Sequence, residues 1–169
     1  MKSFNDYVNV YREQLAIGDV KIAYKHLLEF LVLLRGHFAN KYPKDYICGH
    51  VYQGYMDMSF FTFTPEALRN RKLKITVIFN HEKICFEIWL TGQSKQIQDE
   101  YWQMLKKKRQ RKYKLPAKPD RFILEKMLVE EPNFNNLETL TEEIDENVMK
   151  FVVDMSEMLL PKPKHRNFR

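Results

Sequence analysis

Apolar and polar residues alternate most clearly from Leu73 to Leu90, LKITVIFNHEKICFEIWL, in two runs that flank a short polar stretch. A period of two, with many β-branched and aromatic residues, is typical of strands, and two such runs around a polar stretch predict a β-hairpin. With the turn at His81-Glu82, Val77 faces Phe86 within a row of apolar residues only. Because a slip by one residue would turn this row to the opposite side, we expect it to face the core.

Helical spacing of apolar residues appears on both sides of the hairpin. Residues 5–17 have an amphipathic pattern, and Gly18 can end that helix. Residues 20–40 are apolar nearly all round from Leu27 to Leu34, which is typical of a helix buried in a domain. Ser94 can cap a third helix, which follows the hairpin.

The remaining elements are predicted from shorter signals. Asn135, with Glu138 three residues later, has the spacing of a capping box and predicts the start of the last helix. Residues 46–64 predict either two short strands or one long bent strand. The stretch from Arg121 to Glu130 fits both a strand and a helix, and the strand is the preferred interpretation. The fold class predicted is α+β, with an antiparallel sheet of four to five strands flanked by N-terminal, middle and C-terminal helices.

The composition is that of one folded domain. The 169 residues are 44% hydrophobic, which predicts a single domain over 1–169, with 161–169 as a flexible basic tail. No apolar leader is visible, and the longest apolar run, Phe30–Leu34, is far shorter than the roughly 20 residues of a membrane span. Two cysteines, Cys48 and Cys85, do not make a disulfide framework. We therefore expect a cytoplasmic protein that does not contact a membrane.

The net charge of +6 is unevenly distributed along the chain. Residues 106–118 contain eight basic residues and no acidic one. Such a run can neutralise phosphates, so nucleic acid is one partner that the sequence allows. A solvated helix end, favoured by the helix dipole, is the other interpretation. The candidate nucleic-acid contacts are Lys106, Lys107, Lys108, Arg109, Arg111 and Lys112.

Asp57 and Glu87 are the carboxylates that suggest catalysis. In the expected hairpin, Lys74 lies diagonally from Glu87, within reach of an ion pair. Two carboxylates on neighbouring strands with a lysine resemble the Mg²⁺-binding core of restriction-endonuclease-like enzymes, but Trp89 stands where that core has its lysine. A solvated or ion-paired sheet face is the alternative. We therefore expect no catalytic residue and keep Asp57, Lys74 and Glu87 as candidates only.

Cys48, His50, His81 and Cys85 are of the residue types that bind zinc. Their spacing contains no paired-cysteine motif, and isolated buried cysteines with a turn histidine explain the pattern better. We therefore expect neither a metal nor another cofactor.

Aromatic residues are frequent around the predicted sheet and the helix after it. Tyr and Trp side chains often line a small-ligand pocket or a protein interface, and packing in the core is the alternative. The residues that would line such a pocket, or the interface of a homodimer, are Tyr52, Tyr55, Trp89, Tyr101 and Trp102.

Three segments, GYMDMSFFTFTP (54–65), LKITVIFNHEKICFEIWLTG (73–92) and IQDEYW (97–102), resemble a family of small bacterial proteins with no assigned activity. The likeness continues into NLETLTEEI and covers about two-thirds of the chain. The part from FEIWL to the last helix also resembles modules appended to restriction-nuclease-like proteins. These resemblances imply an antiparallel α+β fold and add to the nucleic-acid hypothesis.

The sequence therefore predicts a non-catalytic, cytoplasmic binding or accessory module that can form a homodimer. The alternatives are a nucleic-acid-binding protein and a degenerate, metal-dependent nuclease-like hydrolase that uses Asp57 and Glu87.

Overall fold

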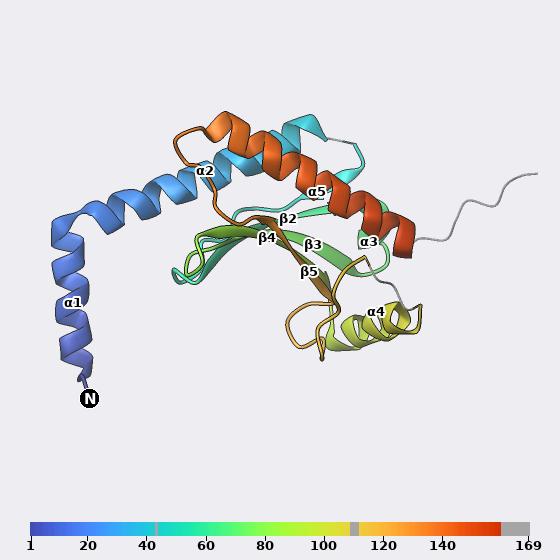
Figure 1. Cartoon of the computed structure of the whole chain (residues 1–169), viewed down its shortest axis with the longest axis horizontal. Coiled ribbons are helices and arrows are strands. Elements are labelled where there is room, and N and C mark those ends of the chain that lie inside the picture. Colours follow the sequence, from blue (N-terminus) through green and yellow to red (C-terminus); the bar gives the residue numbers. More distant parts are fainter. Residues whose placement is uncertain (43, 109–111, 160–169) are drawn as a thin grey trace, which may run out of the picture.

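The computed structural model describes residues 1–42, 44–108 and 112–159, and the tail predicted over 161–169 lies outside these ranges. An antiparallel five-stranded sheet, in the order β1-β2-β3-β4-β5, is combined with helices, so the α+β prediction is confirmed (Figure 1). In chain order the elements are α1 (Phe4–Ile17), α2 (Asp19–Lys41), β1 (Tyr46–Cys48), β2 (Met58–Pro65), α3 (Glu66–Arg69), β3 (Leu73–Asn80), β4 (Cys85–Gly92), α4 (Lys95–Lys107), β5 (Leu124–Val129) and α5 (Leu137–Leu159).

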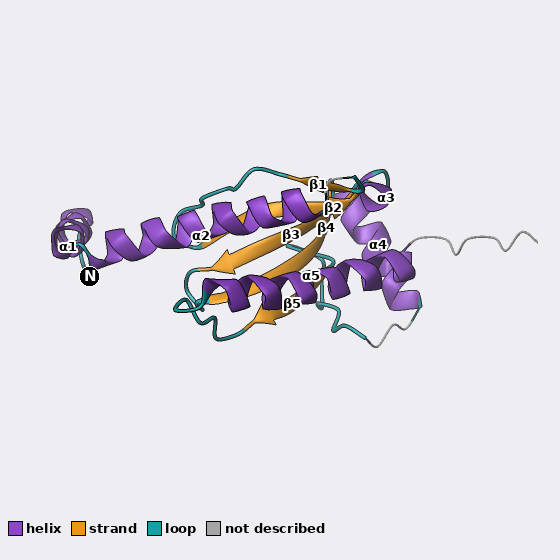
Figure 2. Ribbon diagram, turned by 90° about the horizontal axis from the view of Figure 1, so that it is seen from above, coloured by secondary structure: helices purple, strands orange, loops and turns teal. Residues whose placement is uncertain are grey.

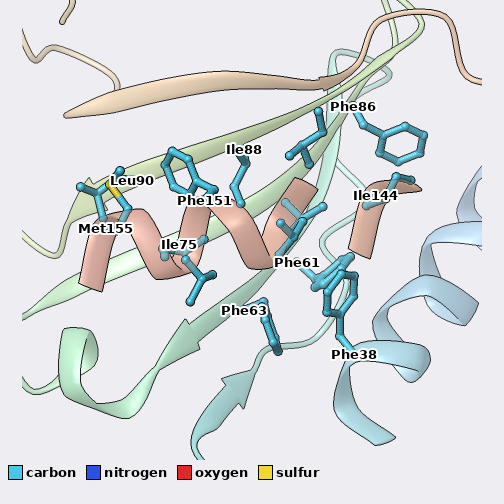
Figure 3. Packing of buried hydrophobic residues seen from close by; sticks show 14 of the residues in the cluster. Phe38, Phe61, Phe63, Ile75, Phe86, Ile88, Leu90, Ile144, Phe151 and Met155 are labelled. Atoms are coloured by element: carbon cyan, nitrogen blue, oxygen red, sulfur yellow. The ribbon is translucent and has the colours of Figure 1, made fainter. Parts of the chain in front are cut away.

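Helices α2 and α5 lie side by side on one face of the sheet (Figure 2). The core is formed between these helices and the apolar face of the strands, where Phe38 of α2 and Phe151 of α5 are fully buried (Figure 3). Phe61 and Phe63 of β2 meet Phe38 with ring centroids 5.9 and 4.7 Å away. The alternation of the strands explains which side chains enter this core. The opposite face of the central strands is covered in part as well, because Ile78, Cys85 and Glu87 are also buried.

The hairpin of β3 and β4 forms as predicted, but its predicted register is wrong by two residues. Val77 pairs with Ile88, and Phe86 pairs with Phe79. The loop has four residues instead of two, and Ile84 lies in it with φ 51° and 47% of its surface exposed. Because side chains alternate with a period of two, a shift by two keeps every residue on its face. Val77 and Phe86 are therefore both fully buried, as expected.

Several helix ends and strands lie where the sequence predicted them. Gly18 has φ 95° and ends α1 in the left-handed conformation. The Ser94 side chain accepts a hydrogen bond from Ile97 N and caps α4. Residues 46–64 form two strands, and the preferred strand within 121–130 is confirmed as β5. The predicted cap of the last helix is wrong by one position, because Asn136 rather than Asn135 accepts from Thr139 N, at 3.2 Å.

Two buried carboxylates of α5 fix distant segments to the helix. Asp145 accepts from Tyr42 Oη at 2.7 Å and lies 2.6 Å from Lys41 Nζ. Asp154 accepts from Tyr113 Oη at 2.5 Å and also pairs with Lys112. Asp145 therefore joins α2 to α5, and Asp154 holds the segment after α4 against the same helix.

Candidate functional site

The most unusual surface of the molecule is its N-terminal part, from Phe4 to Leu33, which we call the arm. It consists of α1 and the first half of α2, and α1 projects away from the sheet (Figure 1). Every residue of α1 is exposed. The exposed apolar residues of α1 at spacings of three and four form a stripe: Phe4, Tyr7, Val8, Tyr11 and Leu15. Tyr11, in the middle of the stripe, has 61% of its surface exposed.

Local interactions alone define the ends of α1. Ser3 Oγ accepts from Asp6 N at 3.3 Å, and Asp6 Oδ2 accepts from Ser3 N at 2.7 Å, which makes a capping box. The hydrogen bond from Ser3 N is the main factor that lowers the pKa of Asp6, and a hydrogen bond from the Ser3 hydroxyl acts in the same direction. An isolated helix of 14 residues is only marginally stable in water. Its helical state is therefore favoured further by any partner that covers the stripe.

The first half of α2 adds more exposed apolar surface to the arm. A shallow, open depression of about 820 Å³, which we call the hollow, lies along this helix, and Leu33, 65% exposed, lines its end. Its charged lining residues are Lys21, Lys25 and Glu29. A second hollow of about 370 Å³ lies at the corner between α1 and α2 and shares Lys21 and Tyr24 with the first. The apolar residues lining the two hollows are Tyr11, Leu15, Val20, Tyr24, Leu28, Val32, Leu33 and Met56.

Comparison with protein families gives a match over nearly the whole described chain. The model described as "Domain of unknown function (DUF7000)" matches residues 4–159. The chain belongs to this family. Its match begins with α1, so the arm is part of the family domain and not an addition to it. No curated protein and no solved structure matches the chain significantly.

The candidate catalytic residues do not form one cluster. Lys74 of β3 pairs with Thr91, whereas Glu87 pairs with Ile78. Lys74 therefore lies four residues along β3 from the residue opposite Glu87, and the predicted diagonal contact is wrong. Glu87 instead lies 3.1 Å from Lys83 Nζ. Asp57 precedes β2 and is separated from Glu87 by strand β3. Backbone N–H groups of Met58 and Tyr55 lower the pKa of Asp57. Each carboxylate thus has its own local partners.

A pocket of about 340 Å³ opens beside Glu87 on the face of the sheet opposite α2 and α5. Lys83, Glu87 and Glu125 supply its charges near the strands, and Phe122 is one of its apolar walls. Partial removal from water and the negative charge of Glu87 both raise the pKa of Glu125. The ion pair of Glu87 with Lys83 already satisfies the most buried carboxylate of this pocket.

The five aromatic candidates lie in three different places. Tyr52 and Tyr55 are exposed in the connection between β1 and β2, where Tyr52 packs on Phe60 at 4.9 Å. The Trp89 ring of β4 lies 5.1 Å from the Phe122 ring in a tilted arrangement, and the Arg121 guanidinium lies over the Trp89 ring. Tyr101 is half-buried on α4, and the neighbouring Trp102 is 8% exposed and donates to Pro116 O at 3.1 Å. The structure therefore does not gather these five residues into one pocket.

The four zinc candidates also lie apart. Cys48 Sγ on β1 donates to Arg35 O, whereas Cys85 Sγ on β4 donates to Glu87 Oε1. His50 is exposed beyond the end of β1. Within the described ranges, no three His, Cys, Asp or Glu side chains are grouped to hold a metal ion. Burial is the main factor that raises the pKa of both thiols, which disfavours the thiolate that zinc would need.

Three of the described basic candidates contact the protein itself. Lys106 Nζ lies 4.6 Å from the centre of the Trp102 ring, Lys108 Nζ donates to Met158 O at 3.0 Å, and Lys112 pairs with Asp154. Lys107 is exposed on α4. Arg109 and Arg111 lie outside the described residues. Nucleic-acid binding by this run stays a prediction.

One histidine contact escaped the sequence analysis. His81 Nε2 lies 2.8 Å from Ser59 Oγ, and Ser59 is fully buried. The Ser59 hydroxyl donates to Gln53 O, so His81 must donate to Ser59. This direction is the reverse of a catalytic Ser–His pair, in which the imidazole accepts the hydroxyl proton. The Ser59–His81 contact therefore links β2 to the hairpin loop, and Ser59 also holds the connection before β2 through Gln53 O.

In the part of the chain that the structure describes, each helix is too short or too polar to span a membrane.

Proposed function

We propose that the protein is a non-catalytic binding module that forms a homodimer through the arm. The observation that carries this proposal is that α1 has a continuous apolar stripe and no buried residue. Contiguous exposed apolar surface on a soluble protein marks a site of association. Among the described residues, most of the exposed large apolar side chains belong to the arm, and the others, such as Tyr55, Met127 and Val153, are spread over several elements.

The charges of α1 favour a protein partner over a membrane surface. The helix contains two acidic residues, Asp6 and Glu13, and one basic residue, Arg12. Helices that lie on anionic membranes are rich in Lys and Arg on their polar face. A net negative helix with a narrow apolar stripe is instead suited to packing against another helix.

The energetics favour a second copy of the same chain. Burial of one large apolar side chain stabilises a complex by roughly 1.5–3 kcal/mol. Association itself costs about 4–15 kcal/mol, so the stripe of one copy alone barely exceeds this cost. A partner must therefore add apolar surface of its own, and a second copy does so in a symmetric contact, because the stripes of both copies become buried. A homodimer therefore uses this surface most effectively.

The proposal includes a cytoplasmic location in a bacterial cell. It is supported by the free thiols of Cys48 and Cys85, which suit a reducing compartment, and by the family resemblance of the hairpin segments.

Sedimentation velocity of the intact protein between about 1 and 100 μM tests the proposal, because this range brackets a micromolar dimer. We expect the wild-type protein to sediment as a dimer at the upper concentrations. Tyr7→Asp combined with Tyr11→Asp should leave a folded monomer, because each change puts a charge into the stripe. Val153→Asp is the matched control, since Val153 is 49% exposed on α5, outside the arm.

A wild-type protein that stays monomeric throughout this range contradicts the proposal. A dimer that survives both Tyr→Asp changes but dissociates with Val153→Asp places the interface elsewhere and contradicts it as well. Circular dichroism of each variant verifies that the sheet and the other helices remain folded.

A further inference from the structure

Resting on the proposed function, we infer that the two copies exchange their arms: α1 of each copy lies in the hollow along α2 of its partner. The proposed homodimer alone would also allow two α1 helices to pack on each other. The inference therefore names both surfaces of the contact, the stripe on one copy and the hollow on the other.

The hollow is open because the α1 of the same chain leads away from it. At Gly18 the backbone takes φ 95°, and α1 leaves the direction of α2 (Figures 1 and 2). Only the last turns of α1, at Tyr11 and Leu15, lie beside the start of α2, so α1 leaves the stretch of α2 from Lys25 to Leu33 uncovered. The connection between the two helices is a single residue, Gly18, which prevents α1 from folding back along α2 as an antiparallel pair.

The stripe and the hollow agree in length. Helix α1 has 14 residues and is therefore about 21 Å long. The stretch of α2 that borders the two hollows, from Val20 to Leu33, has the same number of residues and the same length. A helix of this size can thus bury its whole stripe against the exposed half of α2.

The charges of the two surfaces are complementary. The rim of the hollow contains Lys21, Lys25 and Glu29, a net positive set. On α1 the charged residues beside the stripe are predominantly acidic, with Asp6 and Glu13 against one arginine. Lys25 and Glu29 form only an exposed ion pair of 3.7 Å with each other, so Lys25 is available to a partner at little cost.

Because α1 of each copy contacts the hollow of the other, the assembly is closed and ends at two copies. Each copy contributes one helix and one hollow, so two copies related by a two-fold axis satisfy both surfaces and leave none open. An α1–α1 contact would leave the hollow along α2 exposed, including Val32 and Leu33 at its end. The exchanged arrangement is therefore the one that covers the whole apolar surface of the arm.

Disulfide crosslinking between differently tagged copies tests the exchange. One copy carries Tyr11→Cys and the other carries Lys25→Cys; both carry Cys48→Ala, and the buried Cys85 is retained. Tyr11 and Lys25 lie near the middle of their helical stretches, so they meet whichever way α1 runs along α2. We expect a crosslink in most of the dimers that contain both tags, and at least tenfold fewer when Val10→Cys, on another side of α1, replaces Tyr11→Cys.

The outcomes separate this inference from the proposed function. Crosslinks of the Tyr11→Cys copy with itself, without mixed crosslinks, overturn the exchange and retain the homodimer. A dimer in sedimentation that gives neither crosslink also overturns the exchange. A monomer overturns both, and capture of a different protein on the arm overturns the choice of a second copy.

Discussion

Asp145 of α5 accepts a hydrogen bond from Tyr42 at the end of α2, with 2.7 Å between Tyr42 Oη and Asp145 Oδ1, although the residues are 103 positions apart. His37 Nε2 and Lys41 Nζ each lie 2.6 Å from the other carboxylate oxygen. The Asp145 side chain is 4% exposed, so these three groups provide the polar contacts that water would otherwise give. The Asp145 carboxylate therefore connects α2 to α5, the two helices that cover one face of the sheet.

Replacement of Asp145 by Asn should lower the free energy of unfolding by roughly 2–4 kcal/mol at pH 7, because it removes a buried charge from three donors. Urea denaturation followed by circular dichroism measures the change. Glu146→Gln, at the exposed neighbouring position, is the control and should stay within about 0.5 kcal/mol of wild type. An equal loss of unfolding free energy in the two variants would show that the contacts of Asp145 do not contribute specifically to stability.

The same carboxylate predicts how stability depends on pH. Burial acts to raise the pKa of Asp145, but hydrogen bonds from Lys41, His37 and Tyr42 outweigh it and hold the pKa below the ordinary value of 3.8. The unfolded chain then takes up the proton first as pH falls, so stability present above pH 3.8 is lost below it. Urea midpoints measured from pH 6 down to about pH 3 should fall more steeply for wild type than for Asp145→Asn. Parallel curves would contradict the assignment.

The hairpin register predicts opposite results for two neighbouring positions. Phe86 is fully buried against Phe79, so Phe86→Ala should cost about 3–5 kcal/mol. Ile84 is exposed in the loop at φ 51°, a conformation that disfavours β-branched residues, so Ile84→Gly should be neutral or stabilise by up to about 1 kcal/mol. Thermal and urea unfolding distinguish them. In the register expected from the sequence, Ile84 faces Phe79 in the core, and its loss would be costly.

The nucleic-acid alternative has a direct test. Since Lys106, Lys108 and Lys112 contact Trp102, Met158 and Asp154, few charges of the described run are available to phosphates. We expect no saturable binding of a labelled single-stranded oligonucleotide by fluorescence anisotropy at about 50 mM salt, where such contacts are strongest. Binding that weakens steeply between about 50 and 200 mM salt would instead support the nucleic-acid hypothesis.

The sequence by itself determined the elements and their faces. The alternation in 73–90 identified the hairpin and the buried sides of Val77 and Phe86 because a period of two depends only on neighbouring residues. Local backbone chemistry likewise identified Gly18 and Ser94 as helix ends. The register escaped this reasoning because a shift by two preserves every face, and the four-residue loop that sets it contains no distinctive turn motif.

Only the tertiary structure decided which groups meet across long distances in the chain. Asp145 lies beside an apolar stripe like many solvated acids, and only the packing of α2 on α5 brings three donors to it. The register that pairs Phe86 with Phe79 places Lys74 opposite Thr91, away from Glu87. The arm is the clearest case, because amphipathic spacing shows that a helix has an apolar side. Whether the chain itself covers that side depends on the direction in which Gly18 turns α1, which is a property of the three-dimensional fold.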